Sequence, residues 1–396
     1  MTDICIIGGG ASGMMAAIKI AKENPSLNII LIEKKEKLGS KIYATGNGRC
    51  NITNTNCHTF GDTSKDFRNI GVEIKVTDEG RAYPVSEQAA DVVFALENAV
   101  KAYGVEVILN TFVTAVEKNK NGKYKIRTEG KFKKEILAHK VVIATGGKAA
   151  AAFGTTGDGY KLATALGHKV NKVIPALVPI ECENATIGFL PGVRAKGKVT
   201  LYRKDFFVHE EQGEIQFTKD GLSGICIFNM SSFIRISKDT KFNDYYVEAD
   251  FISQYKDMEI LHILSIRRNI NGLKTVDLFN SIVNSKLAHK ILKKWSDKFN
   301  MAREIDNDSL KCIVDDFRHV RFNVTGVKGW KEAQCTAGGV DLDEFNSETM
   351  ESISCPGIYF IGEVIDYQGP CGGYNLENAW ETARKAGKAI CTEYMK

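Results

Sequence analysis

Long apolar runs and paired cysteines are missing from this sequence of 396 residues. A membrane-spanning helix needs about 20 consecutive apolar residues, and no uninterrupted apolar stretch reaches that length, so we expect no membrane association. The 10 cysteines include no Cys-x-x-Cys pair and no spacing with histidine that is typical of a metal site, so we expect no metal and reduced thiols. Because the N-terminus leads directly into an apolar strand, with no secretory signal before it, we expect a cytoplasmic protein.

A strong excess of one charge is also absent. The 53 Lys and Arg residues stand against 48 Asp and Glu residues, which leaves a net charge of +5. The basic residues are scattered, and the densest run, Lys131 to Lys134, is typical of an exposed hairpin edge. Binding to a phosphate backbone requires a localised basic groove. We therefore expect a small-molecule substrate and no nucleic acid, and a monomer or small homo-oligomer.

A glycine-rich turn follows the first apolar run, Ile4 to Ile7. It has the pattern Gly-x-Gly-x-x-Gly, formed by Gly8, Gly10 and Gly13, and Glu33 ends a second apolar run. This arrangement is the dinucleotide-binding fingerprint. The first glycine allows the tight turn, the second lets the backbone approach a pyrophosphate, and the third lets the next helix pack closely.

The helix predicted from Ser12 to Glu23 begins at this turn. Its exposed amides and its dipole favour a phosphate group, while the carboxylate of Glu33 can accept hydrogen bonds from ribose hydroxyls. From this part of the chain, the residues that we expect to bind the nucleotide are Gly8, Gly10, Ala11, Ser12, Gly13, Glu33 and Lys34.

The choice between NAD and FAD rests on later segments. A strand at 357–361 ends in Gly362 and Glu363, and a pair of glycines then opens a predicted helix over 376–395. The acid can accept a hydrogen bond from a ribityl hydroxyl, and a helix N-terminus can face the flavin edge where negative charge gathers on reduction. These segments and the strand at 141–144 together predict a tightly but non-covalently bound FAD. The residues expected to contact it are Thr145, Gly146, Gly147, Gly362, Glu363, Gly372, Gly373, Tyr374 and Asn375, with Val113 near the adenine.

The block GSKIYATGNGRCNITN at 39–54 resembles the signature of the BaiN/YhiN-type flavoproteins, a family of bacterial FAD-dependent oxidoreductases that includes reductases. The sequence departs from the family pattern at Asn47, where a glycine is common, and at Gln368, where an aspartate is more usual. The resemblance extends over essentially the whole chain. Further matches are EGRAYPVS at 79–86, TGDGY at 156–160, PALVP at 175–179, FTKDGLSG at 217–224, TAGGV at 336–340 and GGYNL at 372–376.

The resemblance adds cofactor-binding residues. Lys41 and Arg49 follow the second strand, where cations can meet the pyrophosphate. Cys50 lacks a partner at the spacing of disulfide reductases, so we interpret it as a small residue that packs in the turn. The residues expected to bind FAD on this ground are Lys41, Arg49, Cys50, Asn51 and Asp158.

Candidates for catalysis are few. Arg81 and Tyr83 could bind a carboxylate or polarise a carbonyl, although a turn that packs two domains would look the same. Cys371 directly precedes the flavin-facing helix, where a thiol could also be no more than a wall of the pocket.

The order of predicted elements indicates an α/β protein. We expect a doubly wound, glutathione-reductase-like Rossmann domain for FAD at 1–180, with a β-meander at about 112–137. A β-rich insert at 181–250 and a helical insert at 251–315 follow, and 316–396 returns to the FAD-binding domain.

The resemblance implies a reductase that takes electrons from NAD(P)H and passes hydride through FAD N5 to a small organic acceptor. Since no second Gly-x-Gly-x-x-Gly follows another strand, NAD(P)H would bind transiently. Three alternatives remain open: an oxidase of a small amine, a flavin-dependent RNA-modifying protein and a non-catalytic flavin carrier.

Overall fold

The structure is a computed structural model that describes residues 2–184, 188 and 190–395. The chain divides into two compact units. Unit 1 consists of Met1–Ala176 and Ala333–Lys396, and unit 2 consists of Leu177–Glu332.

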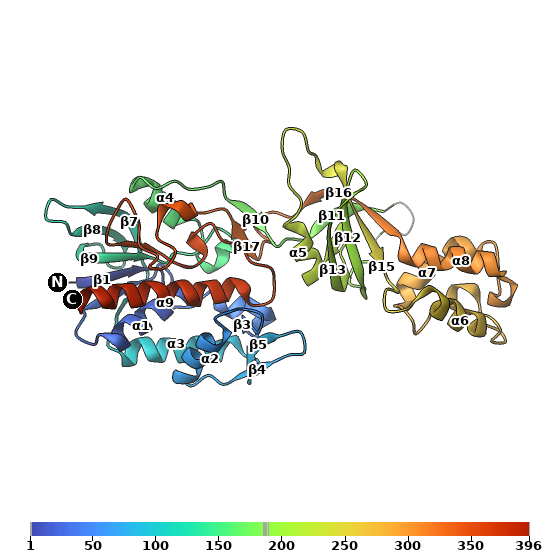
Figure 1. Ribbon diagram of the computed structural model, residues 1–396, viewed down its shortest axis with the longest axis horizontal. Helices are drawn as coiled ribbons and strands as arrows, with labels where there is room; N and C mark the ends of the chain where they lie inside the picture. Colours follow the sequence, from blue (N-terminus) through green and yellow to red (C-terminus); the bar gives the residue numbers. More distant parts are fainter. Residues whose placement is uncertain (1, 185–187, 189, 396) are drawn as a thin grey trace. The chain divides into compact units, whose positions relative to one another are not determined.

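A parallel sheet forms the centre of unit 1 (Figure 1). Its strands run in the order β6 (Glu106–Ile108), β2 (Ile29–Ile32), β1 (Thr2–Ile7) and β9 (Glu135–Ile143), and β18 (Ile358–Phe360) pairs with β9. β1, β2 and β18 are almost continuously apolar and buried, as expected for parallel strands that are covered on both faces.

The predicted β-meander is present, and its third strand is longer than the sequence indicated. β7 (Thr111–Lys118) pairs antiparallel with β8 (Tyr124–Gly130), and β8 pairs with the first half of β9. The second half of β9 pairs with β1 and β18. The meander and the central sheet therefore share one strand, because the residues at 137–140 include no turn former.

Helices cover the sheet of unit 1. α1 (Ala11–Glu23) packs against both α3 (Ala89–Ala102) and α9 (Tyr374–Tyr394), and α9 lies alongside it over much of its length (Figure 1). Small buried residues on both helices, such as Ala16, Ala17, Ala383 and Ala386, allow this close packing. The other helices of the unit are α2 (Phe60–Asn69) and α4 (Asp158–Ala165).

Two small sheets complete unit 1. β10 (Ile174–Ala176) pairs with β17 (Cys335–Ala337). β5 (Arg81–Pro84) lies between β3 (Thr53–Asn54) and β4 (Ile74–Val76), and both of its pairings are antiparallel. β3 belongs to the block at 39–54 and β5 to the block at 79–86, so two matches of the sequence signature form one sheet.

Unit 2 is built on a closed β-barrel. Its strands, in order around the barrel, are β11 (Ile180–Glu183), β14 (Gly221–Ser223), β13 (Phe206–Phe217), β12 (Arg194–Arg203), β15 (Tyr245–Asp250) and β16 (Val320–Val327). β16 closes the barrel by pairing with both β11 and β15. The structure thus places 316–332 in unit 2, whereas the sequence assigned this segment to the FAD-binding domain.

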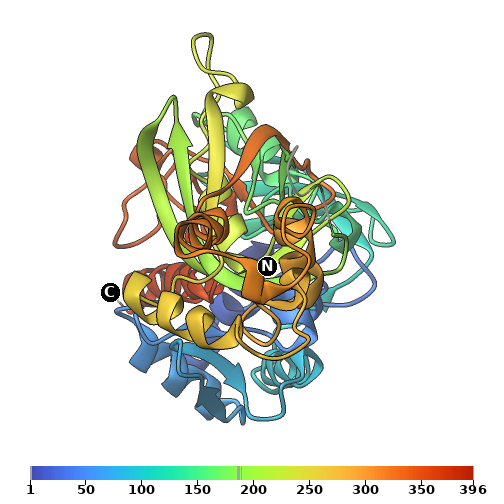
Figure 2. The same cartoon turned by 90° about the vertical axis from the view of Figure 1, so that its right-hand side faces the viewer.

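In the described part of unit 2, four α-helices accompany the barrel. α5 (Ile225–Ser231) packs on β13, while α6 (Asp257–Arg267), α7 (Ser285–Ser296) and α8 (Asn307–Arg318) lie together at one end (Figures 1 and 2). The side chain of Asp306 caps α8 by accepting a hydrogen bond from Ser309 N at 2.8 Å. One hydrophobic core joins these helices to the barrel, so the β-rich and helical inserts form a single unit.

No helix in the described ranges has the length and apolar character to cross a membrane. Those same ranges contain no group of three or more His, Cys, Asp or Glu side chains placed to hold a metal ion.

Candidate functional site

A cavity opens in unit 1 at the carboxyl ends of β1 and β2, beside the N-terminus of α1. In open α/β sheets, ligands bind at this edge. Its empty space is about 1300 Å³, part of which is open to solvent. The residues expected to bind the cofactor that line it are Gly8, Gly10, Ala11, Ser12, Glu33, Lys34, Lys41, Val113, Thr145, Gly146, Asp158, Glu363 and Asn375.

The other expected cofactor residues lie behind or beside this lining. Several are glycines at which two backbones approach closely: a Cβ on Gly13 would lie 1.9 Å from Gly8 O, and a Cβ on Gly373 would lie 2.5 Å from Thr53 O. These glycines shape the walls of the cavity without facing it. The residues outside the lining are Gly13, Arg49, Cys50, Asn51, Gly147, Gly362, Gly372, Gly373 and Tyr374.

The glycines of the first turn have different surroundings. Gly8 has φ +109° and a Cβ there would lie 2.4 Å from Ala144 O, so both its conformation and its neighbours require glycine. Gly10 has φ −82°, and no described atom lies within 4 Å of where its Cβ would be. Because Gly10 lines the cavity, that open space is where a ligand can approach the backbone.

Glu33 holds this turn in place. Its Oε2 accepts a hydrogen bond from Gly9 N at 2.7 Å, and its Oε1 accepts one from Lys35 N at 2.8 Å. Each carboxylate oxygen can accept further hydrogen bonds, and Glu33 lines the cavity. The expected contact with ribose is therefore compatible with this arrangement.

Two lysines among the expected cofactor residues, Lys34 and Lys41, have acidic partners within the cavity lining. Lys34 forms an ion pair with Asp158 and donates to Thr156 Oγ1 at 2.8 Å. Lys41 Nζ lies 2.7 Å from Glu363 Oε2. Both pairs bring residues from distant parts of the chain together in the cavity lining.

Arg49 and Cys50 pack within the signature turn. The guanidinium of Arg49 lies over the ring of Tyr83 at 4.7 Å from its centroid, and its Nε donates to Gly46 O at 3.2 Å. Cys50 is fully buried and adopts φ +58°. Burial raises the pKa of the Cys50 thiol to about 12, against a weaker opposing hydrogen bond from Thr45.

Cys50 is therefore expected to resist alkylation. The thiolate is the reactive form, so at pH 8 a thiol with a pKa near 12 reacts at least about 100-fold more slowly than an ordinary exposed cysteine. Iodoacetamide treatment of the native protein, read by peptide mass spectrometry, should modify the exposed Cys312 and spare Cys50. Equal rates at the two residues would contradict the packing role.

Hydrogen bonds join the signature block at 39–54 to the first turns of α9. Trp380 Nε1 donates to Ile52 O at 2.9 Å, and Asn54 Nδ2 donates to Gly372 O at 2.9 Å. These contacts place the glycines before α9 directly against β3. The block at 39–54 and the GGYNL match at 372–376 therefore form one structural element.

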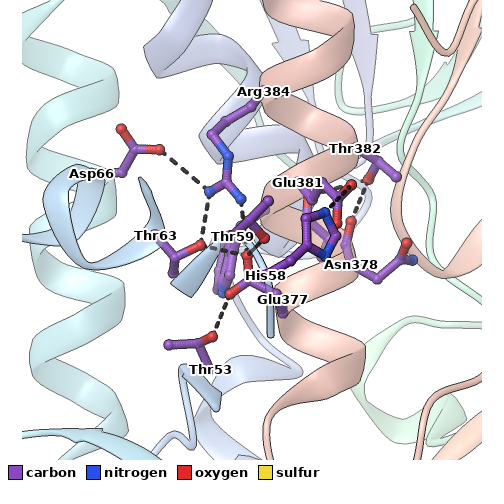
Figure 3. Close-up of polar contacts among 12 residues, drawn as sticks. Thr53, His58, Thr59, Thr63, Asp66, Glu377, Asn378, Glu381, Thr382 and Arg384 are labelled. Atoms are coloured by element: carbon purple, nitrogen blue, oxygen red, sulfur yellow. Dashed lines mark hydrogen bonds and ion pairs between the residues drawn. The ribbon is translucent and has the colours of Figure 1, made fainter. Parts of the chain in front are cut away.

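A buried carboxylate lies at the centre of this junction (Figure 3). Glu377 is 3% exposed. Arg384 Nη2 donates to it at 2.9 Å and Thr63 Oγ1 at 2.6 Å, and the hydroxyls of Thr53 and Thr59 donate as well. Glu377 thus links α9 to β3 and to α2.

The charge of Glu377 depends on this network. Burial alone would raise the pKa of the Glu377 carboxyl, but the hydrogen bonds from the three threonines and from Arg384 outweigh burial and hold it below its usual value. Removing the charge should therefore weaken the folded state at neutral pH.

The sign of the pH dependence follows from the lowered pKa. The contribution of the carboxylate is complete above the unfolded-state pKa of about 4.3 and is lost as the pH falls toward the lower folded-state pKa. We expect the stability difference between the wild type and Glu377→Gln to be constant from pH 7 to 5 and to shrink below about pH 4. Urea unfolding across this range measures it, and a difference that stays constant to pH 3 would contradict the account.

A model of the family described as HI0933-like protein Rossmann domain matches residues 2–65 and 57–389. The chain belongs to the HI0933-like family of FAD-dependent oxidoreductases.

Members of known activity match over the full length. The chain is 32% identical over 414 residues to the 3-dehydro-bile acid delta(4,6)-reductase of Clostridium scindens, covering 98% of this chain and 99% of that protein. It is 28% identical over 415 residues to the ribosomal RNA dihydrouridine synthase of Haemophilus influenzae, covering 97% of each. Among solved structures, the 3-ketosteroid delta1-dehydrogenase from Sterolibacterium denitrificans is similar with a TM-score of 0.53 at 13% identity, covering 99% of both chains, which shows a shared fold.

These findings confirm the resemblance to the BaiN/YhiN-type flavoproteins and the expected α/β FAD-binding fold with an inserted β-rich part. The positions of the HI0933-like signature residues agree with a flavin site. Besides the open space at Gly10, Thr145 lines the cavity, and its buried Oγ1 has no hydrogen-bond partner in the described part of the chain. A buried hydroxyl without a partner is costly, so a ligand that supplies the partner fits here.

Several important residues were not expected from the sequence. Glu377 and Arg384 are separated by seven residues, on the same stripe of α9 as the buried Trp380 and Ala383. Two opposite charges on an otherwise apolar stripe of a predicted helix could therefore have indicated this buried pair from the sequence. Other cavity-lining residues outside the predicted set include Ser40, Thr45, Thr111, Phe112, Phe153, Thr155, Gln334, Cys335, Tyr367, Leu376 and Asn378.

Proposed function

We propose that this flavoenzyme is an NAD(P)H-dependent reductase whose acceptor is a carbon–carbon double bond conjugated with a carbonyl group. The observation that carries the proposal is full-length similarity to two kinds of enzyme whose names describe the loss of such a bond. One is the bile-acid reductase, and the other is the dihydrouridine synthase of ribosomal RNA. A 3-oxo steroid with a neighbouring double bond and a uracil ring share this conjugated group.

The residues that would hold FAD are those that line the cavity. The amides at the start of α1, beside the open space at Gly10, would bind the pyrophosphate, and Glu33 would accept hydrogen bonds from the ribose. Glu363, held by Lys41 and by Thr336 N at 2.9 Å, would accept one from the ribityl chain. When bound, FAD supplies the hydride at N5 after its own reduction by NAD(P)H.

We take a small organic enone as the leading acceptor. Identity to the bile-acid reductase is higher than to the dihydrouridine synthases, 32% against 27–28%. The net charge of +5 is also low for a protein that binds ribosomal RNA. A uridine in ribosomal RNA is the second candidate, which the similarity to the enzymes of Haemophilus influenzae and Escherichia coli supports.

One experiment separates the candidates. The FAD-loaded protein would be incubated with NADH or NADPH and either 4-androstene-3,17-dione or ribosomal RNA transcribed in vitro. Mass spectrometry would measure the gain of two hydrogens in the steroid or in a uridine. A reduced steroid supports the leading candidate and a reduced uridine the second. Hydrogen peroxide formation from small amines, without NAD(P)H, would instead support an oxidase and contradict the proposal.

A further inference from the structure

One face of the sheet formed by β3, β5 and β4 carries a row of polar side chains. Arg81 and Tyr83 are two residues apart on β5, so they lie on the same face. Asn54 on β3 is directly opposite Arg81, and Lys75 on β4 is directly opposite Tyr83. Directly opposite residues share a face, so all four side chains belong to one surface.

Asn54 and Lys75, at the two ends of this row, have hydrogen-bond or ion-pair partners within the protein. Asn54 donates from Nδ2 to Gly372 O and accepts from Asn56 N at 3.0 Å. Lys75 Nζ lies 2.6 Å from Glu87 Oε1. These two residues therefore need no ligand.

Arg81 and Tyr83, in the middle of the row, differ in this respect. The side chain of Arg81, which is partly buried, makes no hydrogen bond or ion pair with any residue in the described ranges. Tyr83 is only 4% exposed, and its ring lies under the guanidinium of Arg49, yet its hydroxyl likewise has no hydrogen-bond partner among the described residues. Both groups are therefore available to donate hydrogen bonds to a ligand.

Neither side chain lines the cavity, but both lie next to segments that do. The Cβ position of Gly46 is 3.2 Å from Tyr83 Cε1, and the preceding Thr45 lines the cavity. Arg81 Nε is 3.9 Å from the Cβ position of Gly372, three residues before the cavity-lining Asn375. Arg81 and Tyr83 thus lie where the signature turn meets the start of α9.

We propose that Arg81 and Tyr83 bind the carbonyl oxygen of the acceptor. This inference rests on the proposed function. Addition of hydride to the far carbon of a conjugated double bond shifts an electron pair onto that oxygen, and a proton from solvent then completes the reduction at the near carbon. A guanidinium and a phenol that lack protein partners are donors ready for such a charge. The shared ligand chemistry is an oxygen conjugated with the reacting bond, whether it belongs to a steroid or to uracil.

The first test follows the two half-reactions separately in Arg81→Gln and Tyr83→Phe. Anaerobic reduction of the bound flavin by NADPH or NADH should proceed at the wild-type rate. Reoxidation by 4-androstene-3,17-dione, or by unmodified ribosomal RNA, should slow by about 10²- to 10³-fold in Arg81→Gln and about tenfold in Tyr83→Phe. Lys75→Gln removes a charge from the same face and should reoxidise normally. Wild-type reoxidation rates in both Arg81→Gln and Tyr83→Phe would overturn the inference.

A binding measurement tests the role of Arg81 without any catalytic turnover. The probes are 5α-androstane-3,17-dione, whose ring cannot be reduced at a double bond, and a dihydrouridine-containing RNA. Calorimetric titration into FAD-loaded protein should show the affinity of one probe lowered at least about tenfold in Arg81→Gln, with Lys75→Gln unchanged. Equal affinities in wild type and Arg81→Gln, or no binding of either probe to the wild type, would overturn the inference. Melting temperatures, measured for Arg81→Lys as well, identify any variant that fails to fold.

The proposed function fails in a different way. If neither nicotinamide nucleotide reduces the flavin of the wild type, the reductase proposal is wrong, and the binding measurement alone judges Arg81 and Tyr83. If the flavin is reduced and reoxidised by an acceptor, but the variants match the wild type, the function stands and the assignment of these two residues falls.

Discussion

A Gly10→Val variant is expected to fold like the wild type and to lose its FAD, with affinity lowered at least about 100-fold, or about 2.7 kcal/mol. The backbone of Gly10 has φ −82°, which valine accepts, and no described atom lies within 4 Å of its Cβ position. The added side chain therefore meets only the space that the cofactor would fill. FAD titration of the apoprotein measures the loss, and circular dichroism and thermal unfolding report the fold.

Two other glycines provide controls for this change. Gly61 also has open space around its Cβ position but does not line the cavity, so Gly61→Val should keep the wild-type affinity for FAD. Gly13→Ala places a Cβ 1.9 Å from Gly8 O and should destabilise unit 1 whether or not FAD is present. A Gly10→Val protein that retains FAD as the wild type does would contradict the site.

A Glu377→Ala variant is expected to lower the free energy of unfolding by about 3–5 kcal/mol, because the mostly buried Arg384 side chain loses its nearer carboxylate and keeps only Asp66 at 3.5 Å. Three threonine hydroxyls lose their acceptor in the same step. For a unit of this size, the melting temperature should fall by about 10 °C. Urea and thermal unfolding of the FAD-free protein measure the effect.

Glu381 is a matched control, one helical turn further along α9. It pairs with Lys385 at 3.0 Å and with His58 at 3.5 Å, both near the surface. Glu381→Ala should cost less than about 1 kcal/mol. If Glu377→Ala and Glu381→Ala unfold at the same temperature, the network in Figure 3 does not hold α9 in place.

Local patterns predicted the elements around the first turn of the chain. The turn at Gly8, Gly10 and Gly13 and the acid at Glu33 depend on backbone geometry over about 30 residues, and such short-range requirements are visible in a sequence. Asn47, which replaces a common glycine of the family, is another position where the local backbone limits the choice of residue. It adopts φ +56° in the structure, a conformation that asparagine tolerates better than most residues.

Long-range contacts limited the prediction elsewhere. Thr53 and Glu377 are 324 residues apart, and no periodicity connects them. β16 looked like part of the FAD-binding domain because it precedes the return to that domain, but its alternating pattern equally suits the barrel that it closes. Which sheet a strand joins is decided by its partners.

The role of single charged residues was the hardest to predict. Arg49 was expected at the pyrophosphate because it follows the second strand and belongs to the signature. The structure instead places its guanidinium on the ring of Tyr83, outside the cavity lining. A long side chain can reach several partners, and only the folded arrangement selects one.

Anaerobic mixing of the purified, FAD-loaded protein with NADH or NADPH, while the flavin absorbance is followed, tests directly whether the protein is a reductase. The account predicts rapid bleaching by at least one nucleotide, followed by recovery of the absorbance on addition of a conjugated ketone or ribosomal RNA. A fully loaded flavin that neither nucleotide bleaches would contradict it.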